Sequence, residues 1–439
     1  MTGQEWLAIA AVLAALMLGL PLFRWLCVRC GASAEASRKT VHVAMGLACA
    51  SFPWIFDRPL PVWVLAALAT LPLVLLRCVP TLRQGLGSTL HGVKRISYGE
   101  VLFAPAVAAV FDLSNGDALL HVIPVGILTV ADAAGAIAGT KWGHRLYVCG
   151  TGKKSMEGSA AFLVVAFLCA FIPLLCLGRV EMQHALWIAL TLAVLSMMAE
   201  GISDRGFDNL IIPLGCHFIL ARLMTSDFPH LITRFAAAVI LLGIVTAGAR
   251  HSTLSGSSLI GSALLGYGCA ILADPRFTLP PLAIFFSHLI TTRRHRLAGL
   301  LDHRLDAVIS HAIGCLSWSL AVERELIDST TGLAGISFAM AVQLAIADVA
   351  TQTWLHSAKP RLLRATVKGW LVAGVPGLIW LWQDAARIAP ALAITVLLTP
   401  LVCRLSHRIE SRYHGSATKL WMIKGTLALL TSAPALLLR

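Results

Sequence analysis

The sequence predicts an all-α polytopic integral membrane protein with about 14–16 transmembrane helices in two halves. Two observations carry this prediction. The chain has 439 residues, of which 57% are hydrophobic and only 13% charged, whereas a soluble domain has about 25% charged residues. Apolar segments long enough to cross a bilayer, about 20 residues each, recur along the chain. The composition therefore disfavours a soluble enzyme, a disordered chain and a secreted disulfide scaffold.

The first apolar segment, residues 7–23, is expected to be a retained helix. A cleavable signal peptide starts with positive charge, but the residues before this segment include an acidic residue and no basic one. Further segments are predicted at 40–56, 60–76, 99–112, 118–139, 158–178, 185–200, 208–225, 235–249, 255–273, 278–292, 306–322, 330–355, 369–383, 387–403 and 420–437. Those at 99–112 and 208–225 are short or interrupted by Gly and Pro, which a membrane tolerates only where protein or a water-filled cavity satisfies the backbone.

The basic residues predict the orientation of these helices. The chain has 35 Lys and Arg against 22 Asp and Glu, a net charge of +13, and cytoplasmic loops collect Lys and Arg. If the N-terminus lies outside and the segments alternate, most of the basic residues fall in cytoplasmic loops. The charge is therefore interpreted as membrane topology, in a bacterial inner membrane or an equivalent one, and nucleic acid is not an expected partner.

Ionisable residues in or beside membrane helices are costly, so they are functional candidates by default. The first half places several of them on the predicted cytoplasmic side. They are Arg38, Lys39 and His42 at the second segment, Asp132 in a Gly- and Ala-rich helix, Glu200 at a helix end, and Asp208 shortly after it.

A basic loop follows Gly143 and runs into the start of a helix. Its residues are Lys153, Lys154, Ser155, Glu157 and Gly158. Free backbone N–H groups, a positive helix terminus and two ammonium groups are what a phosphate site needs. Mg²⁺ binds through one or two carboxylates plus substrate phosphates, and four carboxylates are candidate ligands: Asp132, Glu157, Glu200 and Asp208. The set is coherent with phosphoryl or nucleotidyl transfer.

The same residues also have structural interpretations. Lys153 and Lys154 could be interfacial anchors, and Asp132 could pair with a basic residue inside a helix packing of small residues. His42 fits packing and function equally well. These interpretations do not explain why all four carboxylates and the basic loop fall on one membrane face.

Residues 35–220 carry an ordered set of motifs. They are Ser37-Arg38-Lys39-x-x-His42-x-x-x-Gly46, Ser97-Tyr98-Gly99-Glu100, Asp132-Ala133 with Gly139 and Gly143, Lys154-Ser155-x-Glu157-Gly158-Ser159, and Glu200 with Asp208-Asn209. This set resembles the CTP-dependent polyprenol kinase family, which includes dolichol kinase and phytol kinase. Small departures are Ala131, where the family usually has Gly, and Gly135, where it usually has Ala.

The resemblance implies CTP as phosphate donor, Mg²⁺ or another divalent cation, and an isoprenoid alcohol that enters from the lipid. It implies catalytic roles for His42, Asp132, Glu157 and Asp208. The nucleotide-binding candidates are Arg38, Lys39, Gly139, Gly143, Lys153, Lys154, Ser155 and Gly158. The general base stays open between Glu157, Asp208 and His42.

The second half resembles the phytyl-phosphate kinase family more weakly, through residues such as Asp348, Thr351 and Lys368. Several expected residues are replaced: Gln352 stands where a Ser-Glu pair is expected, and Lys424 where an Asn-Asp pair is expected. Loss of carboxylates and amides argues against an intact metal site. This half is interpreted either as a diverged kinase with a changed substrate or as a scaffold.

The leading hypothesis is a membrane kinase domain at 1–235 fused to a diverged kinase-like domain at 236–439. It would transfer phosphate from CTP to phytol, geranylgeraniol or another polyprenol on the cytoplasmic face. A second phosphorylation step in the C-terminal half is an additional hypothesis. The enzymatic alternative is a phosphatidate-type cytidylyltransferase, which uses the same donor to make a CDP-lipid. A secondary transporter is a third hypothesis, but it would place its ionisable residues near the bilayer centre.

Overall fold

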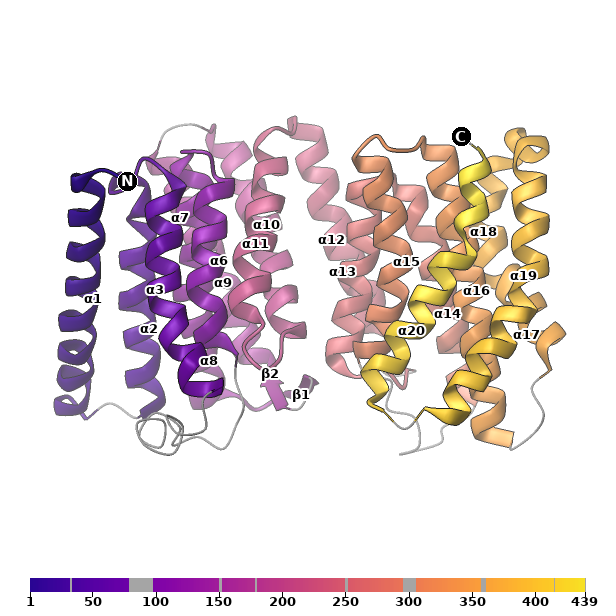
Figure 1. Cartoon of the computed structure of the whole chain (residues 1–439), viewed down its shortest axis with the longest axis horizontal. Helices are drawn as coiled ribbons and strands as arrows, with labels where there is room; N and C mark the ends of the chain where they lie inside the picture. Colours follow the sequence, from indigo (N-terminus) through magenta and orange to yellow (C-terminus); the bar gives the residue numbers. More distant parts are fainter. Residues whose placement is uncertain are drawn as a thin grey trace. The chain divides into compact units, whose positions relative to one another are not determined.

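The computed structural model describes residues 1–31, 34–78, 98–149, 152–177, 180–248, 252–294, 305–356, 361–413 and 415–438. These residues form helices and one two-stranded antiparallel hairpin (Figure 1). The predicted fold class is confirmed: the chain is an all-α polytopic membrane protein. Its contacts divide it into two compact units, Met1–Ala236 and Ala237–Arg439, called unit 1 and unit 2 below.

The helices of unit 1 run alternately up and down, except that α8 continues α7 in the same direction (Figure 1). They are α1 (Gly3–Arg29), α2 (Ala34–Ala50), α3 (Pro59–Cys78), α6 (Gly99–Leu113), α7 (Ala118–Gly126), α8 (Asp132–Trp142), α9 (Met156–Cys176), α10 (Met182–Ile202) and α11 (Asp208–Met224). A π-helical stretch, Ile127–Ala131, joins α7 to α8. Because π-helical turns are frequent at functional sites, the position of this stretch directly before Asp132 is notable.

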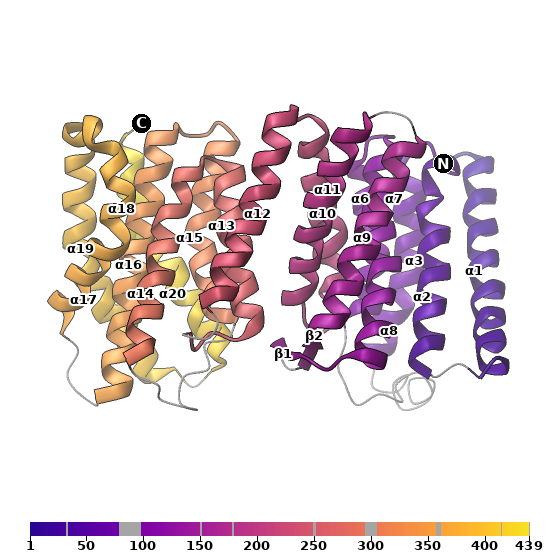
Figure 2. The same ribbon diagram turned by 180° about the vertical axis from the view of Figure 1, so that it is seen from behind.

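The core of unit 1 lies where α9 packs on α10 and on the π-helical stretch. Phe162 and Leu174 of α9 and Ile188 and Leu192 of α10 are almost completely buried. The hairpin of β1 (Leu146–Cys149) and β2 (Gly152–Ser155) lies at the beginning of α9, and Figure 2 shows it at one end of the helices. The apolar helices therefore carry the polar hairpin at their end.

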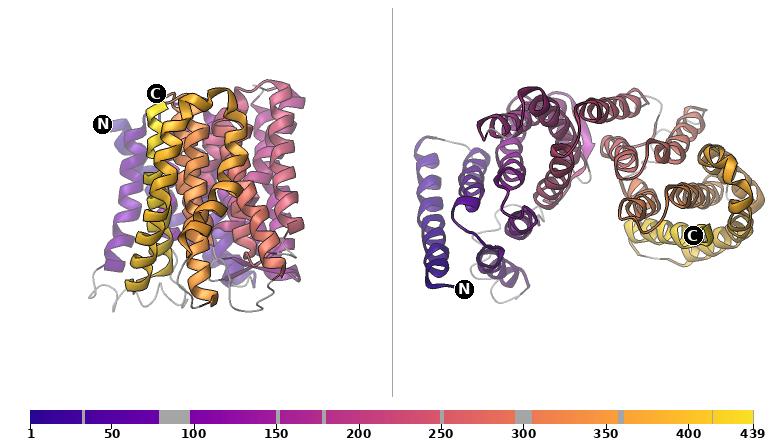
Figure 3. Two further views of the ribbon diagram at one scale, coloured as in Figure 1. Left: turned by 90° about the vertical axis from the view of Figure 1, so that its right-hand side faces the viewer. Right: turned by 90° about the horizontal axis from the view of Figure 1, so that it is seen from above.

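The helix α12 (Phe228–Gly248) crosses the boundary, and the remaining helices form unit 2. They are α13 (Gly256–Leu272), α14 (Leu279–Arg294), α15 (Leu305–Glu323), α16 (Ser329–His356), α17 (Leu362–Gly369), α18 (Val375–Leu378), α19 (Ala385–Arg412) and α20 (Ala417–Thr431). A second π-helical stretch, Trp370–Gly374, separates α17 from α18. The helix α16 is central: it contacts α14, α15, α17, α19 and α20, which lie around it in Figure 3.

Nine helical segments of the described residues are long and apolar enough to cross a membrane, and two shorter apolar helices accompany them. This number is lower than the predicted 14–16 for two physical reasons. The helices α2, α6, α11 and α14 have only 15 to 17 residues. The segment Leu362–Arg412 counts once, although it reverses direction before α19 (Figure 1). The larger number therefore stays a prediction.

Candidate functional site

Six ionisable residues gather at the end of unit 1 that lies opposite the N-terminus (Figure 1). They come from α2, α8, β2, α10 and α11, and we call them the unit 1 cluster: Lys39, His42, Asp132, Lys154, Glu200 and Asp208. All six were site candidates in the sequence. The structure thus brings residues from five separate elements to one end of an apolar bundle.

Lys39 and Asp132 form the first ion pair of this cluster. The Lys39 Nζ atom lies 2.5 Å from Oδ2 of Asp132, and the two side chains are only 9% and 13% exposed. A Cβ atom at Gly46 would lie 1.9 Å from the Thr129 methyl group. Glycine at this position therefore lets α2 approach the π-helical stretch closely, which brings Lys39 to Asp132.

His42 lies beside the same carboxylate. Its Nε2 atom is 3.9 Å from Oδ2 of Asp132, and its ring meets the ring of Phe103 edge-on at 5.3 Å. Within the described part of the chain, this buried Nε2 has no hydrogen-bond partner. A buried nitrogen without a partner is costly, so it is available to a ligand or to a proton.

Lys154 and Glu200 form the second ion pair. The Lys154 Nζ atom lies 2.6 Å from Oε1 of Glu200 and also donates to the Glu200 backbone carbonyl. Burial alone would lower the pKa of the Lys154 ammonium group, but the Glu200 carboxylate outweighs this effect and raises that pKa above its ordinary value. Lys154 therefore stays protonated at neutral pH.

Asp208 adds a third carboxylate at the start of α11. It lies within electrostatic range of Asp132, Lys154 and Lys39. The Asn209 side-chain amide donates to the Gly99 carbonyl at 2.8 Å, which ties this end of α11 to the start of α6. The Asp208 carboxylate therefore shares the electrostatic environment of both ion pairs.

The hairpin selects which lysine enters the cluster. Lys153 and Lys154 are neighbours in β2, so their side chains point to opposite faces: Lys153 is exposed and Lys154 faces inward. On the inner face, the Tyr147 hydroxyl lies 2.9 Å from Ser159 Oγ, and Cys149 Sγ contacts the Ser203 carbonyl at 3.3 Å. The sequence predicted a phosphate-binding loop here, and the structure forms a strand pair that positions Lys154.

Glu157 lies apart from the contacts of the other three candidate carboxylates. Its carboxylate accepts hydrogen bonds from the backbone N–H groups of His144, at 3.1 Å, and Arg145, at 3.2 Å. These bonds hold the segment that leads into β1. In this arrangement Glu157 orders the hairpin, whereas its predicted roles in metal binding and catalysis stay predictions.

The predicted glycines pack where α8 meets α9. A Cβ atom at Gly143 would lie 2.2 Å from the Gly139 carbonyl oxygen, and one at Gly158 would lie 3.0 Å from Ser155 Oγ. The Ser155 hydroxyl accepts from the Gly158 N–H at 3.1 Å and caps α9. These residues therefore have a packing role, and their predicted contact with the nucleotide stays a prediction. The nucleotide-binding candidate Arg38, on α2, is exposed.

Some of these features were missing from the sequence interpretation. Tyr147 was not a candidate, although it lies in a short continuous apolar run, Leu146–Cys149, which is consistent with a strand. Asn209 belongs to the quoted motifs, but nothing in the sequence indicated its partner, and Phe103 was not a site candidate. The π-helical stretch has no sequence signature in the apolar run that contains it.

The charges of the unit 1 cluster fit a divalent cation bound together with phosphate. Two lysines face three carboxylates, so with neutral His42 the cluster has one excess negative charge. The described residues contain no group of three or more His, Cys, Asp or Glu side chains that could hold a metal alone. Mg²⁺ commonly needs only one or two carboxylates when a substrate supplies phosphate oxygens, and Asp132 and Asp208 fit that role.

Unit 2 also contains two lysine–carboxylate pairs. The Lys368 Nζ atom lies 2.6 Å from Oδ1 of Asp348, and Gln352 donates to the other oxygen of this carboxylate at 2.5 Å. Lys424, which is 3% exposed, lies 3.1 Å from Glu410. Gln352 and Lys424, which depart from the family pattern, are thus integrated into buried polar contacts.

Part of the chain is similar to a characterised protein. It is 29% identical to a phytol kinase from Synechocystis sp. over 189 residues, which are 42% of this chain and 78% of that protein. No family model matches the chain. No solved structure matches it either.

Proposed function

We propose that unit 1 is a kinase that transfers the γ-phosphate of CTP to the hydroxyl group of an isoprenoid alcohol such as phytol, geranylgeraniol or another polyprenol. The observation that supports this most is the unit 1 cluster, where two lysines and three carboxylates meet at the end of an apolar bundle. The similarity to a phytol kinase supports both the reaction and the class of acceptor. The choice of CTP as the donor rests on the motifs at residues 35–220, which resemble those of the CTP-dependent polyprenol kinase family.

The reaction divides its tasks among the residues of the cluster. Lys154 and Lys39 offset the charge of the phosphates, which is the main requirement of phosphoryl transfer. The alcohol oxygen attacks the γ-phosphorus, the bond from that phosphorus to the bridging oxygen breaks, and CDP leaves. The hydroxyl proton passes to Nε2 of His42, which lies beside Asp132 and lacks a hydrogen-bond partner within the described residues.

Asp132 and Asp208 would hold Mg²⁺ together with the phosphates of the nucleotide, and the ion would neutralise charge during the transfer. The cluster lies at the opposite end of unit 1 from the N-terminus (Figure 1). If the N-terminus is outside, as the distribution of basic residues predicts, the cluster faces the cytoplasm, where CTP is present.

Two labelled nucleotides test the proposal. Membranes that contain the protein are incubated with an isoprenoid alcohol and with CTP labelled either at the γ- or at the α-phosphate. A kinase transfers the γ-label to the lipid, whereas a cytidylyltransferase supplied with phosphatidate transfers the α-label. Lipid that acquires only the α-label would overturn the proposal.

A pair of variants connects the activity with the cluster. Asp132→Asn removes one charge at constant size and should abolish the transfer of γ-label. The matched control is Lys141→Ala, because Lys141 is an exposed residue on the same helix, whose ammonium group lies over the Trp142 ring. Unchanged activity of Asp132→Asn would refute the assigned site.

A further inference from the structure

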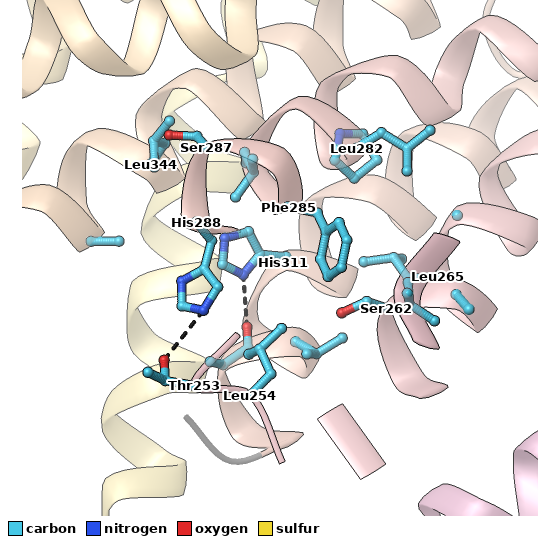
Figure 4. Close-up of a pocket in the computed structure, with 18 of the residues that line it drawn as sticks. Thr253, Leu254, Ser262, Leu265, Leu282, Phe285, Ser287, His288, His311 and Leu344 are labelled. Atoms are coloured by element: carbon cyan, nitrogen blue, oxygen red, sulfur yellow. Dashed lines mark hydrogen bonds between the residues drawn. The ribbon is translucent and has the colours of Figure 1, made fainter. Parts of the chain in front are cut away.

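Unit 2 contains a cavity of about 210 Å³ between α12, α13, α14, α15, α16, α17 and α20 (Figure 4). Most of its wall is apolar and includes Leu241, Leu265, Leu282, Phe285 and Leu344. A cavity of about 150 Å³ is enough for benzene. This one is therefore large enough for one end of a single apolar chain, and the remainder of such a molecule would lie outside it.

The cavity has a polar end. Along α14, Leu282 and Phe285 precede His288, and along α16, Leu344 precedes Asp348 and Thr351. Both helices run in the same direction (Figure 1), and each residue advances a helix by 1.5 Å. The polar residues therefore collect toward the C-terminal ends of α14 and α16.

The polar end offers hydrogen-bonding groups. Figure 4 shows Thr253, His288 and His311 around the cavity, with the Thr253 hydroxyl 3.3 Å from Nε2 of His288. Hydroxyl and imidazole groups can both donate and accept hydrogen bonds. Such an end suits a ligand whose head group is itself a donor and an acceptor.

The charges at this end are already balanced. The Asp348 carboxylate is only 6% exposed, and its two oxygens accept from Lys368 and from Gln352. A phosphate group could pair with Lys368 only if the ion pair between Lys368 and Asp348 broke. It would also place its negative charge next to the Asp348 carboxylate. Burial of an unpaired anion is strongly unfavourable, so the pair selects against an anionic head group.

We propose that the cavity of unit 2 binds the head-group end of a single-chain lipid with an uncharged hydroxyl group, and that the Asp348–Lys368 pair excludes the phosphate ester of the same lipid. This is a lipid-binding site distinct from the unit 1 cluster. Its binding is measured directly, so the result does not depend on whether unit 1 is a kinase.

A photoreactive lipid locates the site. The full-length protein in detergent is exposed to a diazirine derivative of geranylgeraniol or to its monophosphate ester, irradiated and analysed by peptide mapping. We expect the alcohol to label peptides of α13, α14 or α15, and the ester to label them at least about tenfold less, as expected for an anion that is not paired. Equal labelling by the ester, or labelling confined to unit 1, would overturn the proposal.

Two variants test the cavity and its charge selection separately. Ser262→Phe should fill the cavity and remove the labelling of unit 2, whereas Ile290→Phe, at a 67% exposed position of α14, is the matched control and should preserve it. Asp348→Asn leaves Lys368 without its counter-charge and should increase labelling by the ester about tenfold. If the ester gains nothing from Asp348→Asn, charge selection by the pair is refuted even when Ser262→Phe does not fold.

Discussion

Both units place lysine–carboxylate pairs in an apolar helical bundle, but they connect them differently. In each unit an aspartate is followed by a lysine and then by a glutamate: Asp132, Lys154 and Glu200 in unit 1, and Asp348, Lys368 and Glu410 in unit 2. In unit 1 the lysine, in strand β2, pairs with the glutamate, in helix α10. In unit 2 the lysine pairs with the aspartate itself.

This difference changes the charge that each unit offers to a ligand. In unit 1, Lys39 forms an ion pair with Asp132. Asp208 adds a third carboxylate, which interacts electrostatically with residues of both pairs. In unit 2, Lys424 forms an ion pair with Glu410. The charges of Lys368 and Lys424 therefore balance those of Asp348 and Glu410. The same residue types thus leave one excess negative charge in the unit 1 cluster, with neutral His42, and balanced charges in the two pairs of unit 2.

The largest expected effect concerns His42 of unit 1, whose Nε2 atom lies 3.9 Å from Oδ2 of Asp132. His42→Gln should lower kcat by about 10²- to 10⁴-fold, the usual contribution of a general base, in the assay with γ-labelled CTP. His144→Gln is the control, because Glu157 contacts only the backbone N–H of that exposed residue. A normal kcat for His42→Gln would show that His42 is not the general base, and Asp208 and Glu157 would then be the remaining candidates.

The two lysines of β2 test the hairpin register. Lys154→Ala should lower turnover by about 10²- to 10³-fold, as expected for a lost group that stabilises transition-state charge. Lys153→Ala should have a much smaller effect, because its side chain points outward. Steady-state kinetics of the two variants measure this, and equal losses would contradict the inward orientation of Lys154 alone.

In unit 2 the prediction concerns stability. Glu410→Gln leaves the buried Lys424 charge without its partner and should reduce the free energy of unfolding by about 3–5 kcal/mol. The double variant Glu410→Gln/Lys424→Met should recover most of this loss. Unfolding of the purified protein in detergent measures both, and a single variant as stable as the wild type would indicate that the pair is not buried.

Tyr147→Phe should have a smaller effect. It removes the hydroxyl that lies 2.9 Å from Ser159 Oγ, a contact worth about 1 kcal/mol. Hydrogen exchange of the β1 and β2 amides should become faster, and turnover should fall about fivefold. Unchanged exchange would show that Tyr147 does not hold the hairpin.

The smallest effect is expected from Asp348→Asn on the reaction of unit 1. Because Asp348 belongs to unit 2, we expect the first transfer of γ-label to stay within about twofold of the wild type, as for independent sites. The kinase assay on intact membranes measures this. A strong loss would mean that the two units are coupled.

The sequence by itself determined the all-α membrane class and the residue types of the candidate site, because apolar length and charge are local properties of a chain. It did not determine the partners. Lys154 and Glu200 are 46 residues apart, and Lys39 and Asp132 are 93 apart. Only helix packing brings such residues together. The tertiary structure also decided that Lys154 rather than Lys153 points inward and that Glu157 binds the backbone before β1. It further decided that seven helices line one cavity, to which Asp348 contributes.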